Sequence, residues 1–145
     1  MTSNKTNQII FLKGKEAALT KMFNENNFGY LAIGYDPQDL GFEETNDSDI
    51  TSKGFLELTQ GIDGYRRIKL TPYSSEVDPD TQKALVKFKA ELKTDNISGH
   101  RINQMAIVDN ETGTSAETTY FSATTFPTFN KTENSSITFI IGMRL

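Results

Sequence analysis

Residues 84–92 read ALVKFKAEL, and this stretch decides the fold class of the sequence. Val86, Phe88, Ala90 and Leu92 alternate with charged residues at positions 87, 89 and 91. An alternation with period two is typical of a β-strand with one face in a core and the other in solvent. We therefore expect a strand over 84–92, with Phe88 pointing into the core and Lys87 into water.

Other parts of the sequence also favour strands. Turn-forming residues separate apolar and aromatic stretches, and two of these stretches are followed directly by a proline. Polar residues 74–80 are expected to form a loop, and 54–59 a short strand or a turn of helix. The expected strands are 28–35, 64–71 closed by Pro72, 84–92, 101–109, 118–126 ended by Pro127, and 136–144.

One helix is expected, over residues 11–24. Leu12, Leu19, Met22 and Phe23 lie seven, three and one residues apart and form a single apolar stripe on a helix. A helix followed by strands, without helices between the later strands, predicts a mainly β protein: an antiparallel β-sandwich of about five to seven strands. We expect a single domain over residues 11–145, preceded by a flexible arm over residues 1–10.

Composition excludes several kinds of site. The 145 residues include no cysteine and one histidine, which excludes disulfides, thiolate zinc sites and multi-histidine metal sites. Lys and Arg number 15 against 19 Asp and Glu, for a net charge of -4, so we expect no nucleic-acid partner. The apolar run 9–12 is too short to span a membrane, and no membrane partner is expected.

The acidic stretch 36–49 reads DPQDLGFEETNDSD and is expected to be a long surface loop. Its carboxylates could bind calcium, but their spacing does not match an EF-hand loop, and a solvated loop is the favoured interpretation. Glu43 and Glu44, with Asp47 and Asp49, are too close together in one loop to face each other across a sugar, as the two acids of a glycosidase do. We expect Leu40 and Phe42 to be the apolar anchors of this loop.

The remaining candidates for chemistry have ordinary structural explanations. His100 follows Ser98-Gly99 in an expected turn, without the nucleophile motif that a catalytic histidine would serve. Arg66 and Arg67 are expected at a solvated strand edge or a subunit contact, because two residues cannot form a basic face. The tyrosines could form a sugar-stacking platform, or they could be core and cross-strand partners. No catalytic residue, metal or cofactor is predicted.

The order of several short motifs resembles a known family. A helix with KGKEAALTKMF precedes YLAIGYDP, and GYRRIKLTPYSS follows the acidic loop. Then come VKFKAEL, ISGHRINQMAIVDNETG, YFSATTFPTFNK and the final ITFIIGMRL. This order is similar to the N-terminal domain of bacteriophage tail-collar fibre proteins and related small virion proteins. In fibre proteins long fibrous repeats usually follow this domain, whereas here the sequence ends at Leu145.

The resemblance implies a non-enzymatic structural component of a bacteriophage virion, made in the host cytoplasm. Such a chain would act as an assembly or adaptor protein in the tail, collar, baseplate or capsid, bound to copies of itself, as a ring or trimer, and to other virion proteins. The alternative is a carbohydrate-binding β-sandwich module for host-surface adhesion. The residues proposed for the interfaces are Leu12, Leu19, Phe23, Leu40, Phe42, Arg66, Arg67, Ile137, Phe139 and Ile140.

Overall fold

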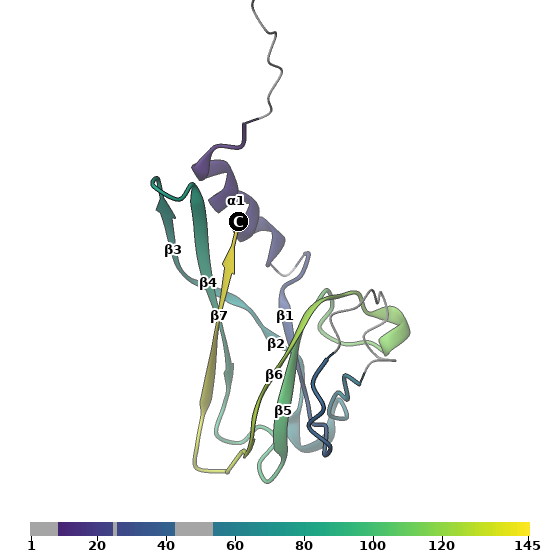
Figure 1. Cartoon of the computed structure of the whole chain (residues 1–145). Helices are drawn as coiled ribbons and strands as arrows, with labels where there is room; N and C mark the ends of the chain where they lie inside the picture. The colour runs from purple at the N-terminus through teal and green to yellow at the C-terminus, as the bar shows by residue number, and fades with distance from the viewer. Residues whose placement is uncertain (1–8, 25, 43–53) are drawn as a thin grey trace, which may run out of the picture.

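The protein is a β-sandwich-like fold with an N-terminal helix. The computed structural model describes residues 9–24, 26–42 and 54–145. Over these residues one α-helix precedes seven strands that form two antiparallel sheets (Figure 1). The fold class expected from the sequence is confirmed. Of the expected arm over 1–10, only Ile9 and Ile10 belong to the described residues.

Helix α1 (Leu12–Met22) lies where the amphipathic stripe predicts it. Leu19 and Phe23 are buried, and the helix packs mainly on the three-stranded sheet. The helix begins without a side-chain cap, because Phe11 occupies the N-cap position and has no oxygen in its side chain. Lys15 Nζ donates a hydrogen bond to the Gln82 carbonyl at 2.7 Å, which ties the first half of α1 to a turn of the sandwich.

The four-stranded sheet, called sheet A here, has the order β2-β1-β5-β6. Its strands are β1 (Tyr30–Gly34), β2 (Ile68–Lys69), β5 (Arg101–Val108) and β6 (Tyr120–Asn130). β1 and β5 lie at the centre, and almost all of their residues are buried because both faces of the sheet are covered there. The short 3-10 helices η2 (Ile62–Gly64) and η3 (Ser115–Glu117) belong to the connections around this sheet.

The three-stranded sheet, called sheet B here, has the order β3-β4-β7. It consists of β3 (Thr71–Asp78), β4 (Lys83–Leu92) and β7 (Ile137–Arg144). Along β4 buried and outward positions alternate as predicted, with Phe88 fully buried and Lys87 exposed. β4 and β7 pair without interruption from Leu85 opposite Arg144 to Leu92 opposite Ile137.

Three boundaries expected from the sequence are wrong. The strand expected over 64–71 does not end at Pro72: only Ile68–Lys69 pair in sheet A, and the next strand contains Pro72 and most of the expected polar loop 74–80. β6 likewise continues through Pro127 to Asn130. Both prolines lie in edge strands beside a shift in pairing register, where a missing N–H leaves no ladder partner unsatisfied.

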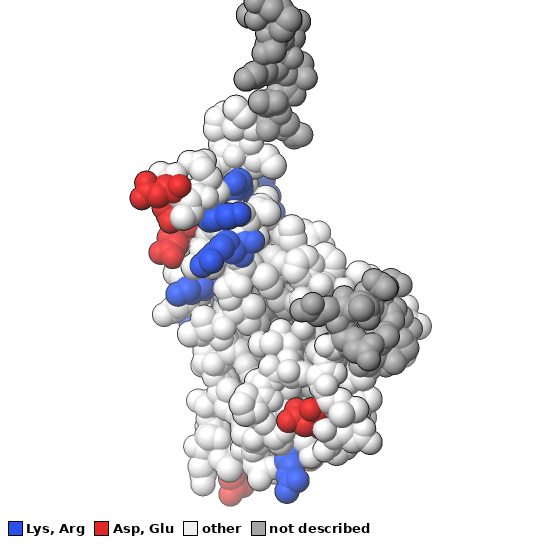
Figure 2. Space-filling model, in the orientation of Figure 1, with Lys and Arg blue, Asp and Glu red and all other residues white. Residues whose placement is uncertain are grey.

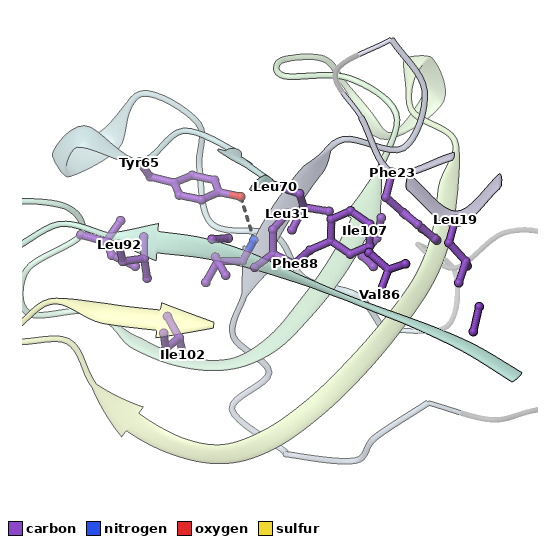
Figure 3. Packing of buried hydrophobic residues seen from close by; sticks show 14 residues of the cluster. Leu19, Phe23, Leu31, Tyr65, Leu70, Val86, Phe88, Leu92, Ile102 and Ile107 are labelled. Atoms are coloured by element: carbon purple, nitrogen blue, oxygen red, sulfur yellow. Dashed lines mark hydrogen bonds between the residues drawn. The ribbon is translucent and has the colours of Figure 1, made fainter. Parts of the chain in front are cut away.

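The core lies between the two sheets and under α1. Figure 3 shows Leu19 of α1, and Phe23 directly after it, beside Val86 and Phe88 of β4. The ring of Phe23 meets the ring of Phe88 edge to face, with centroids 5.4 Å apart. Leu70 is buried in the same cluster at the point where the chain leaves sheet A and enters sheet B. Within the described residues, no helix is both long and apolar enough to cross a membrane.

Candidate functional site

The structure separates the ten residues proposed for interfaces into four groups. Leu19 and Phe23 are buried within the chain's own core, so their assignment to an interface is wrong. The physical reason is that β4 and β3 cover the apolar stripe of the helix, and an intramolecular neighbour produces the same stripe as an intermolecular one. Leu12, at the start of α1, is partly exposed.

The assignment of Arg67 to the surface is also wrong. Its side chain is completely buried, whereas Arg66 beside it is exposed. Adjacent residues of an extended chain point to opposite sides, so one arginine reaches solvent and the other enters the protein. The expectation of a solvated edge or subunit contact is therefore wrong for Arg67, and its burial requires a partner for its charge.

That partner is Glu57, which forms a bidentate pair with Arg67. Arg67 Nε donates to Glu57 Oε2 at 2.9 Å, and Nη2 donates to Oε1 at 2.8 Å. The remaining N–H groups of Arg67 donate to the side chains of Asn110 and Thr118 and to the Gly113 carbonyl. The donors of the guanidinium are thus engaged by protein atoms.

Tyr65 completes this polar cluster. Its hydroxyl donates to Glu57 Oε2 at 2.6 Å and accepts a hydrogen bond from the backbone N–H of Ile33 at 2.9 Å, a contact drawn in Figure 3. Burial, followed by the negative charge of Glu57, raises the pKa of Tyr65 well above its ordinary value. Burial alone would lower the pKa of Arg67, but hydrogen bonds and attraction from Glu57 outweigh it and raise that pKa.

The cluster of Glu57, Tyr65, Arg67 and Asn110 is a structural clamp. Glu57 bridges to Gly34 at the end of β1, and Asn110 and Thr118 lie between β5 and β6, so one ion pair joins the β1–β2 and β5–β6 connections of sheet A. The turn that receives Arg67 is itself fixed by η3, where Thr114 and Glu117 form a capping box. A carboxylate held by a guanidinium and a hydroxyl is occupied, so the cluster offers no open acid or base to a substrate.

The acidic stretch is described only as far as Phe42. Leu40 is exposed, while Phe42 packs beside Phe55 with ring centroids 6.5 Å apart. Asp36 accepts hydrogen bonds from the backbone N–H groups of Gln38 and Leu40, which makes it a turn-forming residue. Positions 43–49, including the remaining acids considered for calcium or acid–base chemistry, lie outside the described residues. Within residues 9–24, 26–42 and 54–145, no three His, Asp or Glu side chains are grouped to hold a metal ion.

His100 lies at the surface turn that its sequence context predicts. Its Nε2 is 2.7 Å from Asp63 Oδ2, and the His100 side chain is about one-third exposed. A shallow cavity of about 250 Å³ beside it is lined mainly by Tyr35, residues 56–59 and Ile62. The contact between His100 and Asp63 connects the turn before β5 to η2, so His100 helps to hold these two segments together.

The fourth group of interface candidates lies on β7, at the edge of sheet B. Ile137 and Phe139 belong to its inner row, which is only partly buried, and Ile140 on the outer face is 56% exposed. Across the sandwich lies β6, the edge of sheet A, and Phe126 of β6 meets Phe139 with ring centroids 5.8 Å apart. We call this part of the molecule, formed by β6 and β7, the open side.

Charges are unevenly distributed around the open side. Figure 2 shows Lys and Arg side chains gathered near α1 and the adjoining end of sheet B, with acidic side chains next to them. Most of the remaining surface in this view is uncharged. The open side is therefore largely apolar or neutral, which is the character of a contact surface more than of an ion-binding surface.

Sequence reasoning did not find several residues that define these sites. Glu57 lies ten positions before Arg67 and forms no motif with it. Phe126 and Phe129 lie on either side of Pro127, which was interpreted as a strand end. Ile9, Ile10 and Phe11 are 57–76% exposed, and their only signal was an apolar run next to the helix.

No protein-family model matches the chain, and no curated protein and no solved structure matches it either.

Proposed function

We propose that the chain is a non-enzymatic structural component of a bacteriophage virion. It would act as an assembly or adaptor protein of the tail, collar, baseplate or capsid, in contact with copies of itself and with other virion proteins. The observation that carries the proposal is the open side, where β7 has a half-buried inner row and an exposed Ile140 on its outer face. The motif order described above supports the virion setting.

The polar groups favour a structural role over an enzymatic one. Arg67, Glu57 and Tyr65 are the most deeply buried ionisable groups that contact one another, and they neutralise one another within the fold. Within the part of the chain that the structure describes, the other buried cation is Lys131, which donates to the carbonyls of Thr94 and Thr132 and so holds a loop. Each of these buried charged groups is hydrogen-bonded to a loop or connection, so stabilisation of the fold explains why it is buried.

Carbohydrate binding is the second candidate, and the aromatic residues favour it less. A sugar platform needs two or three exposed aromatic rings on one concave surface. Among the described residues the exposed aromatic side chains are Phe11, Tyr73 and Phe121, which come from the segment before α1, from β3 and from β6. The ring of Phe121 already packs on Phe23 and Phe28.

The proposal is tested in purified particles of the phage whose genome encodes the chain. Quantitative mass spectrometry should find the chain at a fixed number of copies per particle, and crosslinking should join it to itself and to other virion proteins. Particles from a gene deletion should lack a defined part when viewed by electron microscopy. A chain abundant in the lysate but absent from washed particles would contradict the proposal. Selective glycan-array binding that is lost in Tyr73→Ala would favour the second candidate.

A further inference from the structure

Three consecutive apolar residues stand exposed before α1. Ile9, Ile10 and Phe11 are 72%, 57% and 76% exposed, and in Figure 1 this segment leads away from the sandwich. The backbone of Phe11 is extended, with φ -73° and ψ 150°. Large apolar side chains gain free energy when removed from water, so a run of three exposed ones marks a surface for contact.

The four edge strands of the two sheets differ in how well they could accept another strand. β2 has two residues, β3 contains Pro72 and a bulge, and β6 contains Pro127 and two register shifts. Short length, prolines and bulges are the features by which proteins prevent edge-to-edge pairing. β7 has none of them: its eight residues, ITFIIGMR, pair in unbroken register with β4 on one side. Within the described residues, no strand pairs with its other side.

The described residues before α1 match this edge in pattern. Residues 9–11 would span about 10 Å as an extended strand, which covers three of the eight residues of β7. In such a strand Ile9 and Phe11 share one face and Ile10 lies on the other. This places two apolar side chains beside the half-buried inner row of β7 and one beside the exposed Ile140.

We propose that residues 9–11 of one copy pair as a short strand with the free edge of β7 in a second copy. Backbone hydrogen bonds to β7 would supply affinity, and the alternating side chains would fix the register. A second copy is the occupant because Ile9–Phe11 lead away from their own sandwich, while α1 is held in place by Leu19, Phe23 and Lys15. The inference deepens the proposed function, on which its setting in a particle rests.

The test uses the absence of cysteine from the sequence. Full-length Ile10→Cys is mixed with full-length Thr138→Cys, Ile140→Cys or Gly142→Cys, which sample the outer face of β7, and the mixtures are oxidised at high protein concentration. Facing residues of neighbouring strands lie within disulfide range. The matched control is Ser74→Cys, an exposed position on the opposite edge of sheet B.

At least one β7 variant should form the mixed covalent dimer about tenfold faster than the Ser74→Cys control. Ile9→Asp, added to the Ile10→Cys partner, should reduce that rate to the control level, because a charge would be placed on an apolar contact. Ile140→Lys, added to Thr138→Cys or Gly142→Cys, should do the same. Equal rates at β7 and Ser74 would overturn the inference. So would an intramolecular disulfide in Ile10→Cys/Ile140→Cys whose yield does not change on dilution. Neither result would decide whether the chain is part of a virion, because the proposed function is tested separately by the composition of purified particles.

Discussion

β4 and β7 lie side by side in sheet B and have the same alternating pattern, but they differ in burial. The inner residues of β4 are all at most 2% exposed, whereas the inner row of β7, from Ile137 to Met143, is only partly buried. β4 has neighbours on both sides and α1 against its core-facing side, while β7 has a neighbour on one side and lies across from another edge. Alternation therefore determines which face a side chain is on, and the position of the strand in the sheet determines how deeply it is buried.

The strongest way to break this comparison is to truncate one phenylalanine on each strand. Phe88→Ala should lower the free energy of unfolding by about 3–5 kcal/mol, because it leaves a cavity in a fully packed region. Phe139→Ala should cost about half as much or less, because part of its ring is already in contact with water. Urea unfolding followed by circular dichroism measures both values. Equal losses of unfolding free energy would mean that Phe88 and Phe139 are equally well buried, which would contradict the comparison.

Arg67 and Arg66 extend the comparison from apolar to charged side chains. Arg67→Met should destabilise the protein by about 3 kcal/mol, because it leaves the carboxylate of Glu57 without its bidentate partner. Arg66→Met, one residue away and exposed, should change the free energy of unfolding by less than about 0.5 kcal/mol. Thermal and urea unfolding of the matched pair give the two values. A small effect at Arg67 would show that the clamp does not stabilise the connections of sheet A.

The pH dependence of stability tests whether the Tyr65 hydroxyl is buried in its protonated form. Tyr65→Phe should cost about 2 kcal/mol at pH 7, because the N–H of buried Ile33 loses its acceptor. The raised pKa of Tyr65 keeps the hydroxyl protonated in the folded state at a pH where the unfolded chain has released the proton. The folded state then binds more protons, so this contribution is complete below about pH 10 and is lost as pH rises further.

The gap between wild type and Tyr65→Phe should therefore narrow by about 1 kcal/mol per pH unit above pH 10. Unfolding curves between pH 8 and 11 measure it. Tyr73→Phe is the control, since Tyr73 is an exposed tyrosine of β3. A gap that stays constant with pH would contradict burial of a protonated hydroxyl.

The smallest effect is expected on the outer face of β4. Lys87→Ala should change the free energy of unfolding by less than about 0.5 kcal/mol, because its side chain is exposed between two buried neighbours. Differential scanning calorimetry should find nearly the same melting temperature as for wild type. A loss close to that of Phe88→Ala would show that the two faces of β4 are not distinguished in the way the alternation predicts.

The sequence predicted most accurately the elements that contribute many side chains to the core. The expected strand 84–92 and helix 11–24 agree with β4 and α1 to within one or two residues at each end. β3 was missed because nearly all of its residues are exposed, so no alternation marks it, and backbone pairing with β4 holds it in place. Pro72 and Pro127 were interpreted as strand ends because a sequence does not reveal which strands lie at an edge.

The candidate site was harder to predict, for a related reason. The apolar stripe containing Leu19 and Phe23 was identified correctly, but a stripe does not reveal whether its partner belongs to the same chain. Arg67 was assigned to the surface because Glu57 and Asn110 come close to it only after the chain has folded. Neither residue lies at a spacing from Arg67 that has chemical meaning in the sequence.

Leu70 has a mechanical consequence for the open side. The chain passes from β2 in sheet A to β3 in sheet B through this one buried residue, at the edge of the sandwich away from β6 and β7. A short covalent link at one margin acts as a pivot when two plates are pulled apart. The connection 131–136 ties β6 to β7 at the opposite margin, so a load that spreads the two sheets meets a covalent link on each side of the core.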